Sequence, residues 1–296
     1  MTSLLYLVGS GRGGSTLLER VLNSSPTAFA LGEFHCLWRL PVERIVCACG
    51  QPFARCEFWT GAMARSGLGT QGLARLRELE PLVARSHVIA RRRFSLAALD
   101  ADARVRQYLA LQQAVLDAVA RDSGATWLID SSKAGPRAWL VATDVRPLLL
   151  HLHRDAVDVL ASWRQPKWDP SLKAPMHKPS VAAAAVDWIK AEAWATSLAA
   201  RRPVRRIDYA QLVSAPREAL ARALAADAPA LVESIQWLDE RSVRPSPAYH
   251  SLNGNPDRFD AGAITIAARP PALARLPSRD RWAIRLIGGL LDKVAP

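Results

Sequence analysis

Glycines, hydroxyls and one cation crowd into a short loop near the start of the chain. The apolar run Leu4–Val8 leads into Gly9-Ser10-Gly11-Arg12-Gly13-Gly14-Ser15-Thr16, and a helical pattern begins at Thr16. Glycines let the backbone turn and bring its N–H groups to an anion, while a helix N-terminus adds about half a positive charge. We therefore predict a cradle for a phosphate-like group, formed by Gly11, Arg12, Gly13, Gly14, Ser15 and Thr16.

This loop departs at one position from the pattern of nucleotide triphosphatases. That pattern, G-x-x-x-x-G-K-[ST], is matched at Gly9, Gly14 and Thr16, but Ser15 occupies the lysine slot. The cation lies three residues earlier, at Arg12. An enzyme that needs its lysine on the β- and γ-phosphates would be crippled by this change. A protein that holds one 5′-phosphate or phosphosulfate would not.

A second candidate anion site follows the apolar residues 148–152. Arg154 comes where that predicted strand ends, and Ser162 lies eight positions on, two turns into the next helix. A guanidinium at the carboxyl tip of a strand faces the ligand crevice and offers bidentate hydrogen bonds to a phosphate. Alone, Arg154 would more simply pair with a carboxylate. Together with the glycine loop it predicts a phosphate contact, to which Ser162 adds a bond, with His151 and His153 in the core or behind the site.

Strand-like runs alternate with helix-like runs, which indicates βαβ units and a mostly parallel sheet. Strands are predicted at Leu4–Val8, Ala28–Leu31, Thr126–Ile129, Pro147–His153 and Val204–Tyr209. Helices are predicted after the glycine loop and at Val105–Arg121, Ala156–Arg164, Val181–Arg201, Pro216–Ala225, Pro229–Asp239 and Arg279–Lys293. The expected fold is a P-loop-NTPase-like three-layer α/β/α arrangement in which residues 1–296 form a single domain.

Two segments lack the pattern of sheet elements. Residues 36–104 hold the cysteines and a polar helical stretch, and residues 165–180 are rich in proline and carry Trp168 and His177. We interpret both as excursions above the sheet, outside its core, where substrate loops lie in open α/β folds.

The basic composition leaves several partners open. The net charge of +12 and the pI of about 10.3 suit nucleic acid, an anionic membrane surface or an acidic substrate, but also a merely arginine-rich composition. Basic clusters such as Arg91-Arg92-Arg93 are not interleaved with aromatics, so no nucleic-acid partner is expected. No apolar run approaches the roughly 18 residues of a membrane span and no secretory signal is recognisable, which predicts a cytoplasmic protein without a membrane span.

All four cysteines fall in one short stretch, at Cys36, Cys47, Cys49 and Cys56. A four-cysteine zinc site fits the ligand count, but C-x-C is not the usual C-x₂-C spacing. A disulfide is disfavoured in the cytosol. The third alternative is a set of small buried hydrophobic residues, and the sequence does not choose among the three.

With both anion motifs in place, the chain resembles the sulfotransferases that use 3′-phosphoadenosine 5′-phosphosulfate, in particular their bacterial and carbohydrate or tyrosylprotein branch. In that family the first loop grips the 5′-phosphosulfate, and a strand-end arginine with a serine eight positions on grips the 3′-phosphate. Gly11–Leu18, Arg154 and Ser162 carry this resemblance. Further similar stretches are Ile129–Lys133, Cys47–Trp59, His250–Phe259 and Arg206–Val213, the last with the family's acidic pair replaced by Ala210-Gln211.

The resemblance implies transfer of a sulfuryl group to a hydroxyl on a small molecule, sugar or glycolipid, with adenosine 3′,5′-bisphosphate as product and no metal required. Positioning and charge stabilisation should dominate, as in phosphoryl transfer. Arg12 and the loop N–H groups would neutralise the leaving phosphate oxygen. His250–Phe259 resembles a loop that closes over the nucleotide, which implies Asn255 and Arg258 as contacts. Insertions at about 36–104 and 165–200 would cap the acceptor side.

A general base must take the proton of the acceptor hydroxyl. Glu33 ends the second predicted strand, where carbohydrate and tyrosylprotein sulfotransferases place a catalytic glutamate, and it would serve if partial burial raises its pKa. It could instead pair with an arginine. His35 is the rival base, on the same face as Glu33 if the segment is strand-like. Lys133 is expected to reach the sulfuryl oxygens or to stay solvated, with Asp130 orienting it or capping the next helix.

Two other function classes stay open at this point. A P-loop kinase for a small metabolite would need a lysine at Ser15 and an acidic Mg²⁺ ligand, for which Asp130 is the candidate. A non-catalytic anion- or nucleic-acid-binding protein is suggested only by the net charge and leaves both phosphate motifs unexplained. The acceptor and the oligomeric state, with a homodimer as one option, are not fixed by the sequence.

Overall fold

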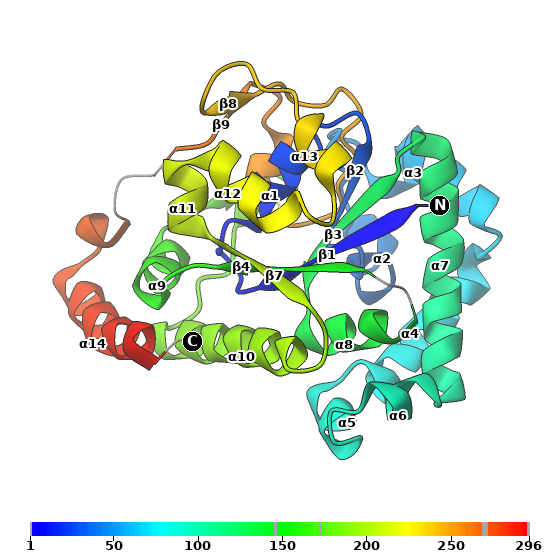
Figure 1. Ribbon diagram of the computed structural model, residues 1–296, viewed down its shortest axis with the longest axis horizontal. Coiled ribbons are helices and arrows are strands. Elements are labelled where there is room, and N and C mark those ends of the chain that lie inside the picture. The colour runs from blue at the N-terminus through cyan, green and yellow to red at the C-terminus, as the bar shows by residue number, and fades with distance from the viewer. Residues whose placement is uncertain (1, 145–146, 172, 268–271, 295–296) are drawn as a thin grey trace.

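The computed structural model describes residues 2–144, 147–171, 173–267 and 272–294. Its central sheet has five parallel strands in the order β2-β3-β1-β4-β7 (Figure 1). These are β1 (Ser3–Gly9), β2 (Ala28–Gly32), β3 (Trp127–Lys133), β4 (Leu148–His153) and β7 (Val204–Asp208). Because β1 is the middle strand, the glycine loop that follows it lies at the centre of the sheet's carboxyl edge. The predicted α/β/α fold class is confirmed.

Successive side chains of β1 enter two different apolar clusters. Tyr6 and Val8 pack into the larger cluster, whereas Leu5 and Leu7 pack into the second, on the opposite face of the sheet. A parallel strand buried on both faces carries a near-continuous apolar run rather than an alternation of polar and apolar residues. This explains why Leu4–Val8 has no polar residue.

Helices cover both faces of the sheet (Figure 1). The helices that pack into the cluster around Leu5 and Leu7 are α1 (Ser15–Leu22), α11 (Tyr209–Ser214), α12 (Pro216–Leu224) and α13 (Pro229–Glu233). The long helices on the other face are α7 (Ala103–Ser123), α8 (Gly135–Asp144) and α10 (Val181–Ala199). A third cluster joins α10 to α9 (Ala156–Arg164) and α14 (Ser278–Val294). No helix in the described parts of the chain combines the length and the apolar character needed to cross a membrane.

Residues 36–104 form small helices that belong to the core. They are α2 (Cys36–Arg39), α3 (Glu57–Ser66), α4 (Gly69–Val83), α5 (Ser86–Arg91) and α6 (Leu96–Asp100). Trp38, Trp59 and Leu76 are completely buried in the same cluster as Tyr6 of β1. The prediction that this segment lies outside the sheet core was therefore wrong. Its apolar residues are spread over five separate helices, so the sequence has no long periodic pattern that would predict their burial.

Residues 165–180 do lie outside the central sheet. They form a hairpin of β5 (Trp168–Asp169) and β6 (Ala174–Pro175). A second two-stranded pair, β8 (Ser242–Val243) with β9 (Ile264–Thr265), lies near the C-terminus.

Element boundaries differ from prediction at a few places. The helix expected to run to Asp239 ends at Glu233, because Trp237 pairs with Val243 in an extended bridge. The last strand ends at Asp208, and Tyr209 already begins α11. Helix α8 was not predicted, since its Gly135-Pro136 start is typical of a turn.

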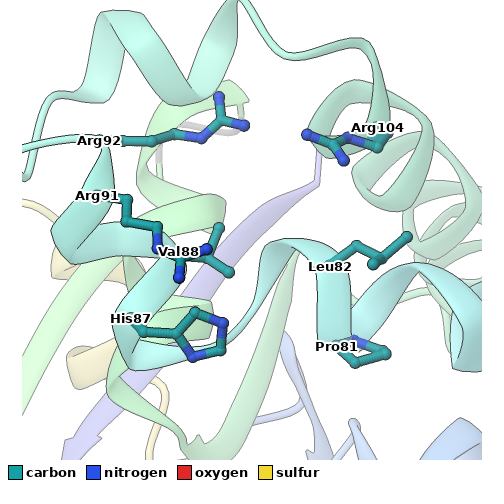
Figure 2. A pocket seen from close by; sticks show the side chains of 7 residues that line it. All are labelled: Pro81, Leu82, His87, Val88, Arg91, Arg92 and Arg104. Carbon is teal, nitrogen blue, oxygen red and sulfur yellow. The ribbon is translucent and has the colours of Figure 1, made fainter.

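A surface pocket of about 260 Å³ lies between α4, α5 and α7 (Figure 2). Arg92 and Arg104 extend toward one another across it, and both pair with Asp102. None of the residues predicted to do chemistry lines this pocket.

Candidate functional site

Each strand of the central sheet ends beside a residue with potential chemistry. The glycine loop follows β1, Glu33 follows β2, Lys133 ends β3, Arg154 follows β4 and Tyr209 follows β7. Because the strands are parallel, all five positions lie at the same edge of the sheet. The fold thus gathers the predicted residues from both halves of the chain.

The glycine loop has a conformation that fits an anion. Gly14 has φ of 103° and precedes α1, which no side chain caps. A Cβ at Gly14 would lie 2.5 Å from the ring of Tyr209, so the backbone approach requires glycine. Backbone N–H groups in the first turn of an uncapped helix are left for a ligand. Sequence analysis did not select Tyr209, because the spacing of the motifs gives no signal for it.

Two further side chains pack against this loop. A Cβ at Gly11 would lie 2.7 Å from the Trp163 ring, and the Arg12 guanidinium lies 4.9 Å from the ring centroid of Trp163. Arg12 Nη2 is also 3.3 Å from Met176 Sδ, which brings the 165–180 hairpin to the loop. Met176 belongs to no motif and was missed, whereas Trp168 of the same hairpin is exposed.

Arg154 joins the two predicted anion sites. Its Nη1 donates a hydrogen bond of 3.2 Å to the carbonyl of Arg12, and its guanidinium lies 4.2 Å from the ring centroid of Tyr209. Its backbone carbonyl accepts a bond of 2.9 Å from Trp188 Nε1. An ion pair with Asp158 at 3.5 Å, the simpler role considered for Arg154, is also present.

Arg154 has a hydrogen-bond donor left that a phosphate could use. Its Nε is buried and has no hydrogen-bond partner among the described residues. A buried donor left unpaired costs about 1–3 kcal/mol, so a ligand oxygen at this point would be favourable. Ser162 lies in the last turn of α9, and no contact within the described chain joins its hydroxyl to Arg154.

Glu33 is held by two residues from distant parts of the chain. Lys133 Nζ donates to its Oε1 at 2.9 Å, and Asn253 Nδ2 donates to its Oε2 at 2.9 Å. Burial alone would raise the pKa of Glu33, but the charge of Lys133 and the two hydrogen bonds outweigh it, so the pKa is lowered. The condition set for Glu33 as a base, a pKa raised by partial burial, is therefore not met. The carboxylate is therefore ionised at neutral pH.

Lys133 lies at the carboxyl edge of the sheet and is mostly shielded from solvent. Its Nζ also donates to the carbonyl of Ser131 at 2.7 Å, and 14% of its side-chain surface is exposed. Asp130 does not orient it, contrary to one prediction, because that fully buried carboxylate pairs with Arg137. The same pairing leaves Asp130 unsuited to be the Mg²⁺ ligand that a kinase would need.

His35 lies close to Glu33, but not on a strand face as predicted. Strand β2 ends at Gly32, and His35 immediately precedes α2. Burial, followed by the charges of Arg39 and Arg137, lowers the pKa of His35 well below its usual value. The imidazole is therefore neutral, and its Nδ1 has no hydrogen-bond partner in the described part of the chain.

The segment around Leu252 extends the sheet edge and delivers Asn253. The Leu252 N–H donates to the carbonyl of Leu31 at 3.0 Å, and the Glu33 N–H donates to the carbonyl of Leu252 at 2.7 Å. A Cβ at the next glycine, Gly254, would lie 3.7 Å from Thr16 Oγ1. The loop thus runs from Glu33 to the start of α1. Asn253 was not predicted as a site residue. Its φ of 55° is a conformation that asparagine tolerates better than most residues.

The two residues predicted from this loop make contacts inside it. Asn255 Oδ1 accepts from the N–H of Asp257 at 3.2 Å and caps the short 3₁₀ helix Pro256–Phe259. Arg258 is buried and donates to the carbonyl of Gly254 at 2.9 Å, and burial lowers its pKa. Both residues therefore hold the shape of the loop, and their contact with a nucleotide stays a prediction.

A buried carboxylate lies behind Arg154. Glu192 of α10 is 3.2 Å from His151 Nε2 and 3.0 Å from His153 Nδ1. Burial would raise the pKa of Glu192, but the two histidines lower it to about 2, while the pairing raises the pKa of His153. The prediction that these histidines lie in the core or behind the site agrees with their burial.

The cysteines do not act as one group. Cys36 lies beside Glu33, with Asn253 Nδ2 3.1 Å from its sulfur. The other three gather around His250, and no disulfide joins any of the four. Two of the three alternatives, a zinc site made from all four cysteines and a disulfide, were therefore wrong.

Comparisons with known proteins agree with this arrangement. The model of the sulfotransferase family matches residues 5–226, an interval that holds the glycine loop, Glu33, Lys133 and Arg154. No curated protein matches the chain.

Three solved structures are similar at low identity. The sulfotransferase domain of the Synechococcus PCC 7002 olefin synthase is 17% identical, with a TM-score of 0.45 over 100% of this chain and 96% of the other. A sulfotransferase domain from the curacin biosynthetic pathway is 15% identical, with a TM-score of 0.49 over 100% and 99%. A sulfotransferase from Mycobacterium avium is 13% identical, with a TM-score of 0.43 over 79% and 67%.

Proposed function

The chain belongs to the sulfotransferase family, and on that premise we propose that it transfers a sulfuryl group from 3′-phosphoadenosine 5′-phosphosulfate to a hydroxyl acceptor. One observation carries the proposal: Arg154, at the end of β4, donates a hydrogen bond to the carbonyl of Arg12 in the glycine loop. Two anion-binding elements therefore adjoin. The proposed donor is a nucleotide with anionic groups at both its 5′ and 3′ positions, so it suits such a pair.

The glycine loop would hold the 5′ end of the nucleotide. The uncapped start of α1 offers backbone N–H groups, and Ser15 and Thr16 add hydroxyls. Arg12 would place its positive charge near the leaving phosphate oxygen. These donors are fixed by the fold before the ligand arrives, which is how charge stabilisation becomes effective in a transition state.

Arg154 and Ser162 would hold the 3′-phosphate. The unpartnered Nε of Arg154 is the group that fits, since a phosphate oxygen would satisfy it. Tyr209 under the guanidinium and Trp188 at the backbone carbonyl restrict how Arg154 moves. A preorganised guanidinium loses less conformational entropy when it binds.

The donor supplies an activated sulfuryl group whose bond to the 5′-phosphate breaks as the acceptor oxygen bonds to sulfur. Glu33 would take the proton of the acceptor hydroxyl, because it is ionised and partly exposed at the open edge of the sheet, and its lowered pKa makes it a weaker base than an unpaired glutamate. Lys133, whose Nζ donates to Oε1 of Glu33, would direct its positive charge toward the sulfuryl oxygens. His35 is the weaker candidate base, since only 9% of its surface is exposed.

The acceptor would be a small molecule, sugar or glycolipid hydroxyl that approaches from the side of residues 36–104 and 165–200. Support comes from the contact of Met176 with Arg12, which places the 165–180 hairpin over the loop. No metal is needed in this scheme, because the cations that it uses are Arg12, Lys133 and Arg154.

Calorimetric titration with adenosine 3′,5′-bisphosphate, beside ATP with Mg²⁺, tests the nucleotide site. We expect metal-independent binding of the bisphosphate and little of ATP. Arg154→Ala should weaken bisphosphate binding by about 10- to 100-fold, since hydrogen bonds to charged groups contribute about 1.5–3 kcal/mol. The matched control is Arg121→Ala, an exposed arginine of α7, which should bind normally.

Two results would overturn the proposal. Preference for ATP with Mg²⁺ would assign the site to a kinase in spite of Ser15. Unchanged bisphosphate binding in Arg154→Ala would mean that the 3′-phosphate does not bind at the end of β4.

A further inference from the structure

Three sulfurs and one imidazole nitrogen converge beside the end of β2. The ligand atoms of Cys47, Cys49, Cys56 and His250 all lie within 4.8 Å of one another. His250 Nδ1 is 3.5 Å from Cys47 Sγ and 3.4 Å from Cys56 Sγ, while Cys49 Sγ is 3.8 Å from Cys56 Sγ. His250 lies 194 positions after Cys56, so the fold and not local sequence assembles the group.

These three separations match edges expected for a tetrahedral metal site. With Zn–S bonds of about 2.3 Å and Zn–N bonds of about 2.0–2.1 Å, tetrahedral angles put two sulfurs about 3.8 Å apart and a sulfur and a nitrogen about 3.6 Å apart. The observed 3.8 Å between sulfurs, and 3.4 and 3.5 Å between nitrogen and sulfur, agree with those edges. A disulfide would need about 2.05 Å between sulfurs.

The backbone around the cysteines is shaped for sulfur ligands. Val46 pairs with Pro52, and the Gly50 N–H donates to the carbonyl of Cys47 at 2.9 Å, which closes a tight turn.

His250 is held in place from two sides. Its ring stacks on Phe58 at 4.8 Å between centroids, and its carbonyl accepts a bond of 2.6 Å from Trp59 Nε1. Nδ1 therefore faces the sulfurs in a fixed orientation. A pocket of about 510 Å³ that includes Cys49, His250, Arg20 and Arg244 in its wall leads to the cluster from the surface and gives an ion a route in.

We propose that Cys47, Cys49, Cys56 and His250 bind one Zn²⁺ as a structural site. Three thiols would lose their protons to solvent as the ion binds, and the neutral imidazole would complete the tetrahedron. Four protein ligands leave no open position for water, which is the composition of a structural site and not of a catalytic one. Soft thiolates with imidazole favour zinc over magnesium or calcium.

The site would fasten two distant segments to each other. The Ala48 N–H donates to the carbonyl of Ser251 at 3.0 Å, and Cys47 pairs with Leu252, whose backbone also bonds to Leu31 and Glu33. Zinc would therefore lock the turn at residues 47–51 onto the segment that carries Asn253. This role is independent of the proposed sulfuryl transfer, because it needs neither donor nor acceptor.

Metal content of the purified, full chain tests the proposal. Plasma mass spectrometry should find about one zinc per chain after growth with added zinc, since structural zinc sites bind their ion tightly. Cys49→Ser and His250→Asn should lose most of it. Cys49 is the exposed ligand, so its variant is the one best placed to fold. Cys36→Ser and His87→Asn, which change residues outside the cluster, should keep the full amount.

Cobalt gives a reading that does not depend on the variants. After removal of zinc under reducing conditions, Co²⁺ should produce the visible absorption of a tetrahedral ion and a thiolate charge-transfer band. Failure of the reduced wild-type chain to take up either zinc or cobalt would overturn the proposal. So would unchanged zinc content in both Cys49→Ser and His250→Asn, or a Cys49–Cys56 disulfide in protein prepared with zinc and without oxygen.

Discussion

Glu33 and Glu192 are carboxylates near two different strands of the same sheet, and each is held by basic side chains. Glu33 follows β2 and contacts Lys133, whereas Glu192 of α10 lies between His151 and His153 next to β4. Burial would raise both pKa values, yet the partners lower both. They differ in access, because 21% of the Glu33 side-chain surface is exposed but only 6% of that of Glu192.

This difference in exposure separates the carboxylate that a substrate could contact from the carboxylate that supports the fold. A hydroxyl can reach Glu33, and its partner Lys133 lies at the same open edge. Glu192 is buried, and His153 directly precedes Arg154 in the chain, so its charge organises the strand end that we assign to the nucleotide. A lowered carboxyl pKa therefore does not by itself mark a catalytic residue, since structural ion pairs produce the same shift.

Glu33→Gln should give the largest effect on turnover. The amide keeps the shape and hydrogen-bonding positions but cannot accept a proton, so kcat should fall by about 10²- to 10⁴-fold, the usual contribution of a general base. Bisphosphate affinity, measured by calorimetry, should stay near the wild-type value. Glu43→Gln, an exposed glutamate close by in the chain, is the control. A loss of affinity as large as the loss of kcat would assign Glu33 to binding.

Glu192→Gln should instead act on stability. Replacing the charged acceptor weakens two hydrogen bonds to histidine, each of a kind that contributes about 1.5–3 kcal/mol. Urea unfolding at neutral pH should show a lower midpoint, whereas the same Glu43→Gln control should not. Turnover per folded molecule should change less than in Glu33→Gln. If turnover falls as far, the two carboxylates do not have separate roles.

The pH dependence of wild-type stability sharpens the contrast. The Glu192 contribution is present above the unfolded value of 4.5 and is lost as pH falls toward the folded pKa of about 2. The His153 contribution, with its pKa raised from 6.5, is complete below 6.5 and is lost as pH rises through the folded pKa. Glu192→Gln should remove the acid limb and most of the His153 limb, because the Glu192 carboxylate takes part in both.

The elements around these residues were predictable to different degrees. The strands with the glycine loop, Arg154 and Lys133 at their ends were located within a few residues, because an apolar run followed by a polar turn is a local signal. Helix α9 was predicted at its observed bounds, Ala156–Arg164. In residues 36–104 only a polar helical stretch was predicted, without the bounds of the five helices, since tertiary packing and not a local pattern stabilises them.

The site itself depended on contacts that no local pattern carries. Glu33 was identified, but the sign of its pKa shift was not, because Lys133 and Asn253 lie 100 and 220 positions away. Likewise the cysteines suggested a metal site, but the fourth ligand, His250, comes from the other end of the chain and replaces Cys36. The four cysteines are close in sequence, but in the fold only Cys47, Cys49 and Cys56 lie together, and they lie with His250.

Lys133→Gln should have the smallest effect of the three substitutions, visible as a change in pH profile. Without the ammonium, the largest influence that lowers the pKa of Glu33 is lost, so this pKa should rise. A base must be ionised to act, so the acid limb of kcat/KM should move to higher pH, while Lys190→Gln, on the exposed side of α10, should leave it in place. Lys133 also lowers the pKa of His35, so a shifted limb alone does not choose between the two bases. His35→Asn decides: the limb persists if Glu33 is the base, and its disappearance would transfer that role to His35.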